Sequence, residues 1–129
     1  MIKQKRLLSV SAMAGFPDFS SVYEKYGYQV TTARTLRKAL SFIKQQHPDV
    51  IVAEFVYAPT YGSQLSNFES LFAAAQAYAP DASFIALVHK NDFHHFEKVR
   101  EKTDRCLALT YPVTHRDMDH CLSSITQPA

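Results

Sequence analysis

Apolar runs of strand length alternate with segments of helical period along the chain, and this alternation constrains the fold more than any other feature of the sequence. The alternation occurs five times, and each helical segment carries apolar residues three or four positions apart, which places them on one helix face. Such an order is typical of βαβ units around a parallel sheet. We therefore expect an α/β fold, with five parallel strands in a three-layer, doubly wound arrangement.

The third of these apolar runs is nearly continuous in Val, Ile, Ala and Phe, as expected of a central strand that is buried on both faces. Glu54 is the single charge within it. The five predicted strands are Arg6–Ser11, Tyr28–Ala33, Val50–Val56, Ser83–Val88 and Cys106–Thr110.

Helix starts are marked by capping signals. Ser66 with Glu69, and Thr114 with Asp117, have the spacing of a capping box, and Asn91 or Asp92 is expected to cap the fourth helix. The aromatic, turn-rich segment Tyr57–Leu65 is predicted to be a loop. The apolar stripes of the five predicted helices are Phe19, Val22, Tyr23 and Tyr26; Leu36, Ala39, Leu40 and Ile43; Phe68, Leu71, Phe72 and Ala75; Phe93, Phe96 and Val99; and Met118, Cys121, Leu122 and Ile125.

Length and composition fit a single domain. The chain has 129 residues, of which 47% are hydrophobic and 20% charged, so it can bury one core, which we expect to span residues 5–126. The formal charge is only +2, which gives little support for a nucleic-acid partner. Cys106 and Cys121 form no CxxC pair and are predicted to be reduced packing residues.

No apolar run approaches the roughly 20 residues that a membrane span needs, so we expect a soluble protein with no membrane partner. The basic N-terminal segment loosely imitates a secretory signal, but Leu7 to Val10 falls well short of an apolar region of about 7 to 15 residues. A cytoplasmic location is therefore predicted.

Three stretches, by their order and separation, resemble the receiver domain of response regulators. Pro48–Glu54 resembles the family segment PDLVLLD, Pro80–Val88 resembles PDIPVIALT, and Leu109–Val113 resembles LTKPV. The resemblance covers nearly the whole chain. It implies a flavodoxin-like sheet with strand order 2-1-3-4-5, and a single receiver-like domain over residues 1–129 with no output domain.

The residues that receivers use for phosphoryl transfer are replaced in this sequence. The resemblance places the phosphoacceptor at Glu54, the acidic pair at Ser11 and Ala12, the hydroxyl at Val88 and the lysine at Tyr111. Mg²⁺ usually needs one or two carboxylates among its oxygen ligands, and only Glu54 is available there. No metal, no cofactor and no phosphotransfer are therefore expected.

These substitutions predict a degenerate receiver, a pseudo-receiver, that is not an enzyme and works by binding a protein. The expected partner is a signalling protein: a histidine kinase, an output protein, another receiver or a second copy of the chain. The alternative is a small-ligand sensor or enzyme that uses the crevice at the strand ends, where Ser11, Glu54, His89 and Tyr111 would gather.

Several residues allow two interpretations. Glu54 is either a built-in phosphate mimic, for which Lys90 would supply a cation, or an ordinary acid exposed at a strand end. The histidines and acids at 94–95 and 115–120 are either metal ligands or a solvated helix face, and their spacing favours the latter. Residues expected to contribute to a partner surface are Tyr57 and Tyr61 in the loop, and Phe93 and Phe96 on the fourth helix.

Overall fold

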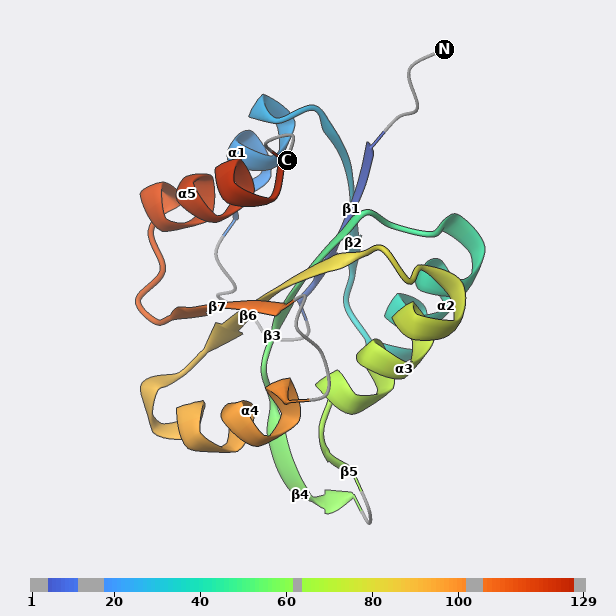
Figure 1. Ribbon diagram of the computed structural model, residues 1–129, viewed down its shortest axis with the longest axis vertical. Helices are drawn as coiled ribbons and strands as arrows, with labels where there is room; N and C mark the ends of the chain where they lie inside the picture. The colour runs from blue at the N-terminus through green and yellow to red at the C-terminus, as the bar shows by residue number, and fades with distance from the viewer. Residues whose placement is uncertain (1–4, 12–17, 62–63, 102–105, 127–129) are drawn as a thin grey trace.

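A central sheet of five parallel strands organises the molecule (Figure 1). The computed structural model describes residues 5–11, 18–61, 64–101 and 106–126. The sheet has the order β2-β1-β3-β6-β7, which is 2-1-3-4-5 when its strands are counted along the chain, so the predicted fold class is confirmed. Its strands are β1 (Lys5–Val10), β2 (Tyr28–Ala33), β3 (Val50–Glu54), β6 (Ser83–Val88) and β7 (Cys106–Thr110).

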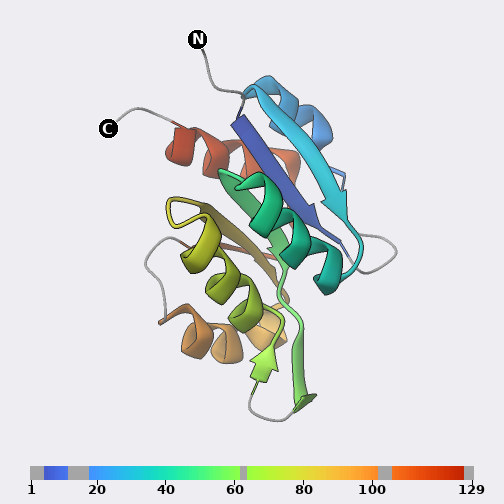
Figure 2. The ribbon, with the colours of Figure 1, turned by 90° about the vertical axis from the view of Figure 1, so that its right-hand side faces the viewer.

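Five α-helices cover the two faces of this sheet. α1 and α5 lie on one face, and α2, α3 and α4 lie on the other, as Figures 1 and 2 show. The helices are α1 (Ser20–Lys25), α2 (Leu36–Gln46), α3 (Phe68–Tyr78), α4 (Phe93–Arg100) and α5 (His115–Thr126). Together with the sheet they give the three layers predicted from the sequence.

The central strand β3 shows how one sequence supplies two cores. Val50 and Val52 pack toward α1 and α5, whereas Ile51 and Ala53 pack toward α2, α3 and α4. All four side chains are at most 1% exposed. Since successive side chains of a strand point to opposite faces, a strand covered by helices on both sides must be apolar throughout. Glu54 follows the face of Val50 and Val52.

Residues after Glu54 form a hairpin, so the prediction of a loop over Tyr57–Leu65 is wrong. β4 (Tyr57–Tyr61) and β5 (Gln64–Ser66) pair antiparallel as a separate two-stranded sheet that projects past the end of the main sheet (Figure 2). Alternation there is masked by Pro59 and by the small residues of the turn, which made the strand signal weak.

Asn67 explains why β3 ends at Glu54 rather than at Val56. Its side-chain amide donates to the Glu54 carbonyl at 2.8 Å, and its side-chain oxygen accepts from the Val56 N–H at 2.9 Å. A side chain thereby satisfies backbone groups that would otherwise continue the strand pairing. The chain turns away from the sheet at this point.

The capping predictions met different outcomes. Thr114 and Asp117 form the predicted reciprocal box at the start of α5, with bonds of 3.0 and 3.1 Å. At the start of α3, Glu69 accepts from the Ser66 N–H at 2.6 Å and from the Ser66 hydroxyl at 3.0 Å, and the Ser66 hydroxyl itself accepts from the Phe68 N–H at 3.1 Å. Asp92 occupies the N-cap position of α4, as predicted, but its side chain makes no cap bond, and a 3₁₀ turn over Lys90–Asp92 leads into the helix.

Both cysteines are free thiols buried in the packed layers, Cys106 on β7 and Cys121 on α5. Among the described residues, no helix is both long and apolar enough to cross a bilayer.

Candidate functional site

The carboxyl ends of the parallel strands bring together the residues that the resemblance singled out. Glu54 ends β3, His89 follows β6 and Tyr111 follows β7. The edge is closed by backbone bonds that continue the sheet pattern, from Tyr111 N–H to the Val88 carbonyl at 3.1 Å and from Ser11 N–H to the Ala33 carbonyl at 2.9 Å. The predicted gathering of Glu54, His89 and Tyr111 is thus present.

A hydrogen bond joins Tyr111 to Glu54. The phenol hydroxyl donates to Glu54 Oε2 at 3.1 Å, and only 12% of the glutamate side chain is exposed. Tyr111 itself packs against the core between the sheet and the α1 and α5 layer. The interpretation of Glu54 as a solvent-exposed acid is therefore wrong, because its carboxylate is largely buried and held by a donor.

His89 covers the same pair from the solvent side. Its ring stacks on the Tyr111 ring with 4.4 Å between centroids and 26° between planes. Its Nε2 lies 3.7 Å from Glu54 Oε1, too far for a hydrogen bond but close enough for an ion pair when the imidazole is protonated. The histidine side chain is 55% exposed. Glu54, Tyr111 and His89 thus form one compact cluster, which we name the Glu54 cluster.

Burial raises the pKa of the Tyr111 phenol above its ordinary value, and the negative charge of Glu54 raises that pKa further. The phenol consequently keeps its proton at neutral pH and remains a hydrogen-bond donor to the carboxylate. A neutral donor occupies the position to which the resemblance assigns a lysine. Lys90 does not replace that cation, since its exposed side chain makes no ion pair with Glu54 in the part of the chain that the structure describes.

Two of the predicted pocket residues lie elsewhere or cannot be placed. The expectation that Val88 lines the pocket is wrong: its side chain is 0% exposed and packs into the core on the α2, α3 and α4 side. Strand pleating explains this, because Val88 and Glu54 point to opposite faces of the sheet. Ser11 is half-buried at the same edge, whereas Ala12 lies outside the described residues.

The Glu54 cluster does not fit a magnesium site of the receiver kind. Its donor set is one carboxylate, one phenol and one imidazole, whereas Mg²⁺ favours carboxylate and water oxygens in octahedral geometry. Ser11, at the neighbouring strand end, contributes no carboxylate. Among the described residues, no group of three or more His, Cys, Asp or Glu side chains is arranged to hold a metal ion.

Some of the residues expected at a partner surface are accessible in the structure, and others are buried. Phe96 is 0% exposed and packs on Phe55 and Phe68, with ring centroids 5.4 and 6.1 Å away, so its assignment to a surface is wrong. It belongs to the inward stripe of α4. Phe93 is half-buried against the core, and the Tyr61 side chain lies outside the described residues.

The sequence did not reveal a contact between the hairpin and α4. The half-buried Tyr57 ring, at the start of β4, lies over the His95 ring with 3.6 Å between centroids. Burial lowers the pKa of His95, and the neighbouring His94 lowers it further. The pair fixes the base of the projecting hairpin against the first turn of α4. No spacing rule connects residues 57 and 95, so only the fold could bring them together.

The acids of α5 have structural roles. Asp117 closes the capping box with Thr114, and Asp119 forms an ion pair with Lys25 of α1 at 2.7 Å. Asp119 also accepts from the Tyr26 hydroxyl. These contacts tie α5 to α1, which favours the helix-face interpretation over metal binding for the 115–120 segment.

Comparison with known proteins places the fold among receiver domains. No family model and no curated protein matches the sequence. A CheY-like response regulator receiver domain protein from Methanospirillum hungatei JF-1 superposes with a TM-score of 0.76 at 18% identity, covering 96% of this chain and 94% of that one. A response regulator receiver domain protein from Clostridium thermocellum superposes with a TM-score of 0.74 at 18% identity, covering 95% and 94%.

A third structure, described as adenylate cyclase from Rhodopirellula baltica, superposes with a TM-score of 0.68 at 20% identity, covering 96% of this chain and 88% of that one. At these identities the comparisons establish the fold. This chain has the CheY-like, flavodoxin-like architecture of receiver domains, and its function has to be argued from its own residues.

Proposed function

We propose that this chain is a cytoplasmic receiver-like module of a two-component type of signalling pathway, which acts by binding another signalling protein and does not depend on phosphorylation. The fold supports the receiver-like part of the proposal. The Glu54 cluster supports the independence from phosphorylation.

The observation that carries the proposal is the hydrogen bond from Tyr111 to the largely buried Glu54 carboxylate. A carboxylate attacks a phosphoryl donor only if it is accessible and if cations neutralise the incoming negative charge. Here a phenol hydroxyl and a stacked imidazole cover the carboxylate, and the donor set does not fit magnesium. Both requirements are therefore unmet at this edge.

The Tyr111 hydroxyl and the His89 ring, which cover the Glu54 carboxylate, also argue against the alternative of a small-ligand sensor or enzyme. A ligand that reached Glu54 would have to displace the Tyr111 hydroxyl and expose a buried carboxylate, which costs free energy unless the ligand supplies an equivalent donor. We therefore retain protein binding as the proposed function. The partner would be a histidine kinase, an output protein, another receiver or a second copy of this chain.

The hairpin and the first turn of α4 form one candidate for the partner surface. The Tyr57 and His95 rings are in contact there, tilted by 37°, and Phe93 is half-buried. Half-exposed aromatic side chains are enriched in protein interfaces. A partner or a second copy would bury them further.

Phosphoryl acceptance is tested by incubating the chain with acetyl phosphate and Mg²⁺, followed by peptide mass spectrometry. We expect no acyl phosphate on Glu54. Glu54→Gln is the matched control, because it preserves shape while removing the acceptor, so phosphate found equally on both proteins has gone to another residue. An acyl phosphate mapped to Glu54 would refute the proposal.

Dimer formation is tested separately by sedimentation of the wild-type chain and of Phe93→Glu, with Arg37→Glu on the other end of the same face as a charge control. Self-association that Phe93→Glu alone abolishes would assign the partner to a second copy. A concentration-independent monomer leaves the other signalling proteins as partners and removes the homodimer.

A further inference from the structure

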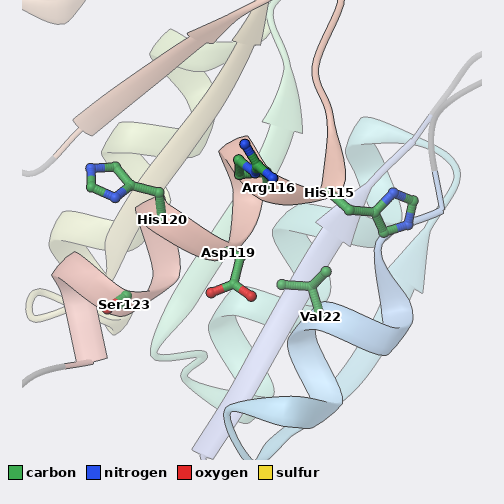
Figure 3. A pocket seen from close by; sticks show the side chains of 6 residues that line it. All are labelled: Val22, His115, Arg116, Asp119, His120 and Ser123. Carbon is green, nitrogen blue, oxygen red and sulfur yellow. The ribbon is translucent and has the colours of Figure 1, made fainter.

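A hollow of about 440 Å³ lies where α5 packs beside α1 (Figure 3). Val22 contributes the apolar wall from α1. Figure 3 shows Asp119 facing Val22 between the two helices, with Arg116 and His115 toward the start of α5. The residues that line this hollow, which we name the α1–α5 hollow, are Val22, His115, Arg116, Asp119, His120 and Ser123.

The acid within the hollow is already neutralised. Lys25 donates to Asp119 at 2.7 Å, and the Tyr26 hydroxyl donates to the same carboxylate. The hydrogen bond from the Lys25 ammonium, and after it the bond from Tyr26, hold the pKa of Asp119 below its ordinary value. Asp119 is therefore a charged group with its partners in place, and it leaves no net negative charge for a cation to recognise.

The basic groups are not paired in this way. Arg116, His115 and His120 are exposed, and none forms an ion pair with a residue in the described ranges. The charge of His115 lowers the pKa of Asp18, but the Asp18 carboxylate already accepts two bonds from Ser20. His115 is held in place by an edge contact with Phe19, 5.1 Å between ring centroids. The hollow thus presents hydrogen-bond donors and the positive charge of Arg116 outward.

The donors of the hollow form a line along α5. Arg116, His120 and Ser123 stand at i, i+4 and i+7, so they share one face of α5. At about 1.5 Å per residue the stripe is roughly 10 Å long. A single small anion can satisfy only one part of such a stripe, whereas carboxylates one helical turn apart match its spacing.

We propose that the α1–α5 hollow docks an acidic helix of a partner protein, with carboxylates about one turn apart facing Arg116 and His120 and an apolar side chain against Val22. This inference rests on the proposed function in one respect, since it requires a protein partner. It is independent of the chemistry at Glu54. Arg116 is the central anchor, because its guanidinium is always charged and can hold a carboxylate through two parallel bonds.

The test uses an Ala-rich helical peptide of about 20 residues with Glu at every fourth position, a length at which an isolated helix forms in water. A matched peptide carries Gln in place of Glu. Amide chemical shifts of the ¹⁵N-labelled chain are followed during titration. We expect the Glu peptide to shift resonances of α5 around 116–123 and of α1 around Val22, and the Gln peptide to bind at least about tenfold more weakly.

Variants distinguish a specific site from general attraction to a basic protein. Arg116→Glu should lower the affinity for the Glu peptide by about tenfold or more, and the milder substitution Arg116→Gln should also lower it. Arg37→Glu is the matched control, because it makes the same charge change at an exposed position on the opposite helix layer. Equal weakening by Arg116→Glu and Arg37→Glu would overturn the proposal, as would shifts that map away from the hollow or an absence of binding.

Inorganic phosphate provides a further arm. If phosphate alone shifts the same resonances and displaces the peptide, the hollow binds a small anion and the docking proposal is wrong. Failure here remains separate from failure of the proposed function, because the acetyl phosphate experiment reports on Glu54, whereas the peptide titration reports on the α1–α5 hollow, whose lining does not include Glu54.

Discussion

The Tyr111 hydroxyl donates to Glu54 Oε2 at 3.1 Å, which links side chains 57 residues apart at the carboxyl edge of the sheet. The bond is a neutral donor to a charged acceptor in a largely buried setting. Hydrogen bonds to charged groups contribute more than neutral ones, and a buried carboxylate that loses its donor is destabilised. The pair therefore stabilises the edge of the sheet while it covers the carboxylate.

Replacing Tyr111 with Phe removes the hydroxyl and keeps the ring that stacks on His89. We expect the free energy of unfolding in urea to fall by about 1 to 3 kcal/mol, the range for a buried charged group that loses a hydrogen bond. Tyr78→Phe is the control, because Tyr78 is 43% exposed and its change should be close to zero. Equal effects of the two substitutions would show that the bond to Glu54 contributes nothing.

The contribution of Tyr111 should depend on pH. The pKa of the Tyr111 phenol is raised in the folded state. Its contribution to the free energy of unfolding is therefore complete below the pKa of the unfolded phenol, about 10, and is lost as the pH rises toward the pKa of the folded state. The stability difference between wild type and Tyr111→Phe should be constant from pH 7 to about 9 and should shrink above about 10. Tyr23, whose pKa burial also raises, is present in both proteins and cancels. A difference that grows with alkaline pH would contradict this assignment.

Substitution of Phe96 tests whether this residue packs in the core or belongs to a partner surface. It lies among Phe55 and Phe68 with no exposed area, so Phe96→Ala should lower the free energy of unfolding by about 3 to 5 kcal/mol. Phe93→Ala should cost less, since Phe93 is only half-buried. Chemical denaturation of both variants shows which substitution lowers the free energy of unfolding more. If Phe93→Ala proved the more damaging substitution, the inward face of α4 would be assigned incorrectly.

The order of the elements could be predicted from the sequence because each strand and helix is specified by local periodicity. Glu54, His89 and Tyr111 could be placed at one edge for the same reason, since the carboxyl ends of parallel strands share an edge. The bond between Glu54 and Tyr111 and the stacking of His89 could not be predicted, because they depend on side-chain directions across strands. Val88 illustrates the limit: one position along the pleat moved it from the expected pocket into the opposite core.

The hairpin and the 3₁₀ turn before α4 escaped prediction for a different reason. Pro59 and the turn residues of the segment conceal the alternation of β4 and β5, and no local signal identifies a 3₁₀ turn at Lys90–Asp92. Asn67 could have been recognised as a capping residue from its position before Phe68. Its actual role, which is to bridge Glu54 and Val56, requires the hairpin to be in place.

The two cysteines should react slowly with thiol reagents in the folded protein. Burial raises the pKa of Cys106 to about 12, and burial also raises the pKa of Cys121, so both thiols stay protonated and shielded at neutral pH. Because the thiolate is the reactive form, alkylation by iodoacetamide at pH 8 should be far slower in the native chain than in urea. Peptide mass spectrometry at successive times gives the rate for each cysteine, and Cys106, which is the less exposed, should be the slower. Rapid modification of Cys106 in native buffer would mean that β7, which forms an edge of the sheet, opens readily, and the packing assigned to that edge would be wrong.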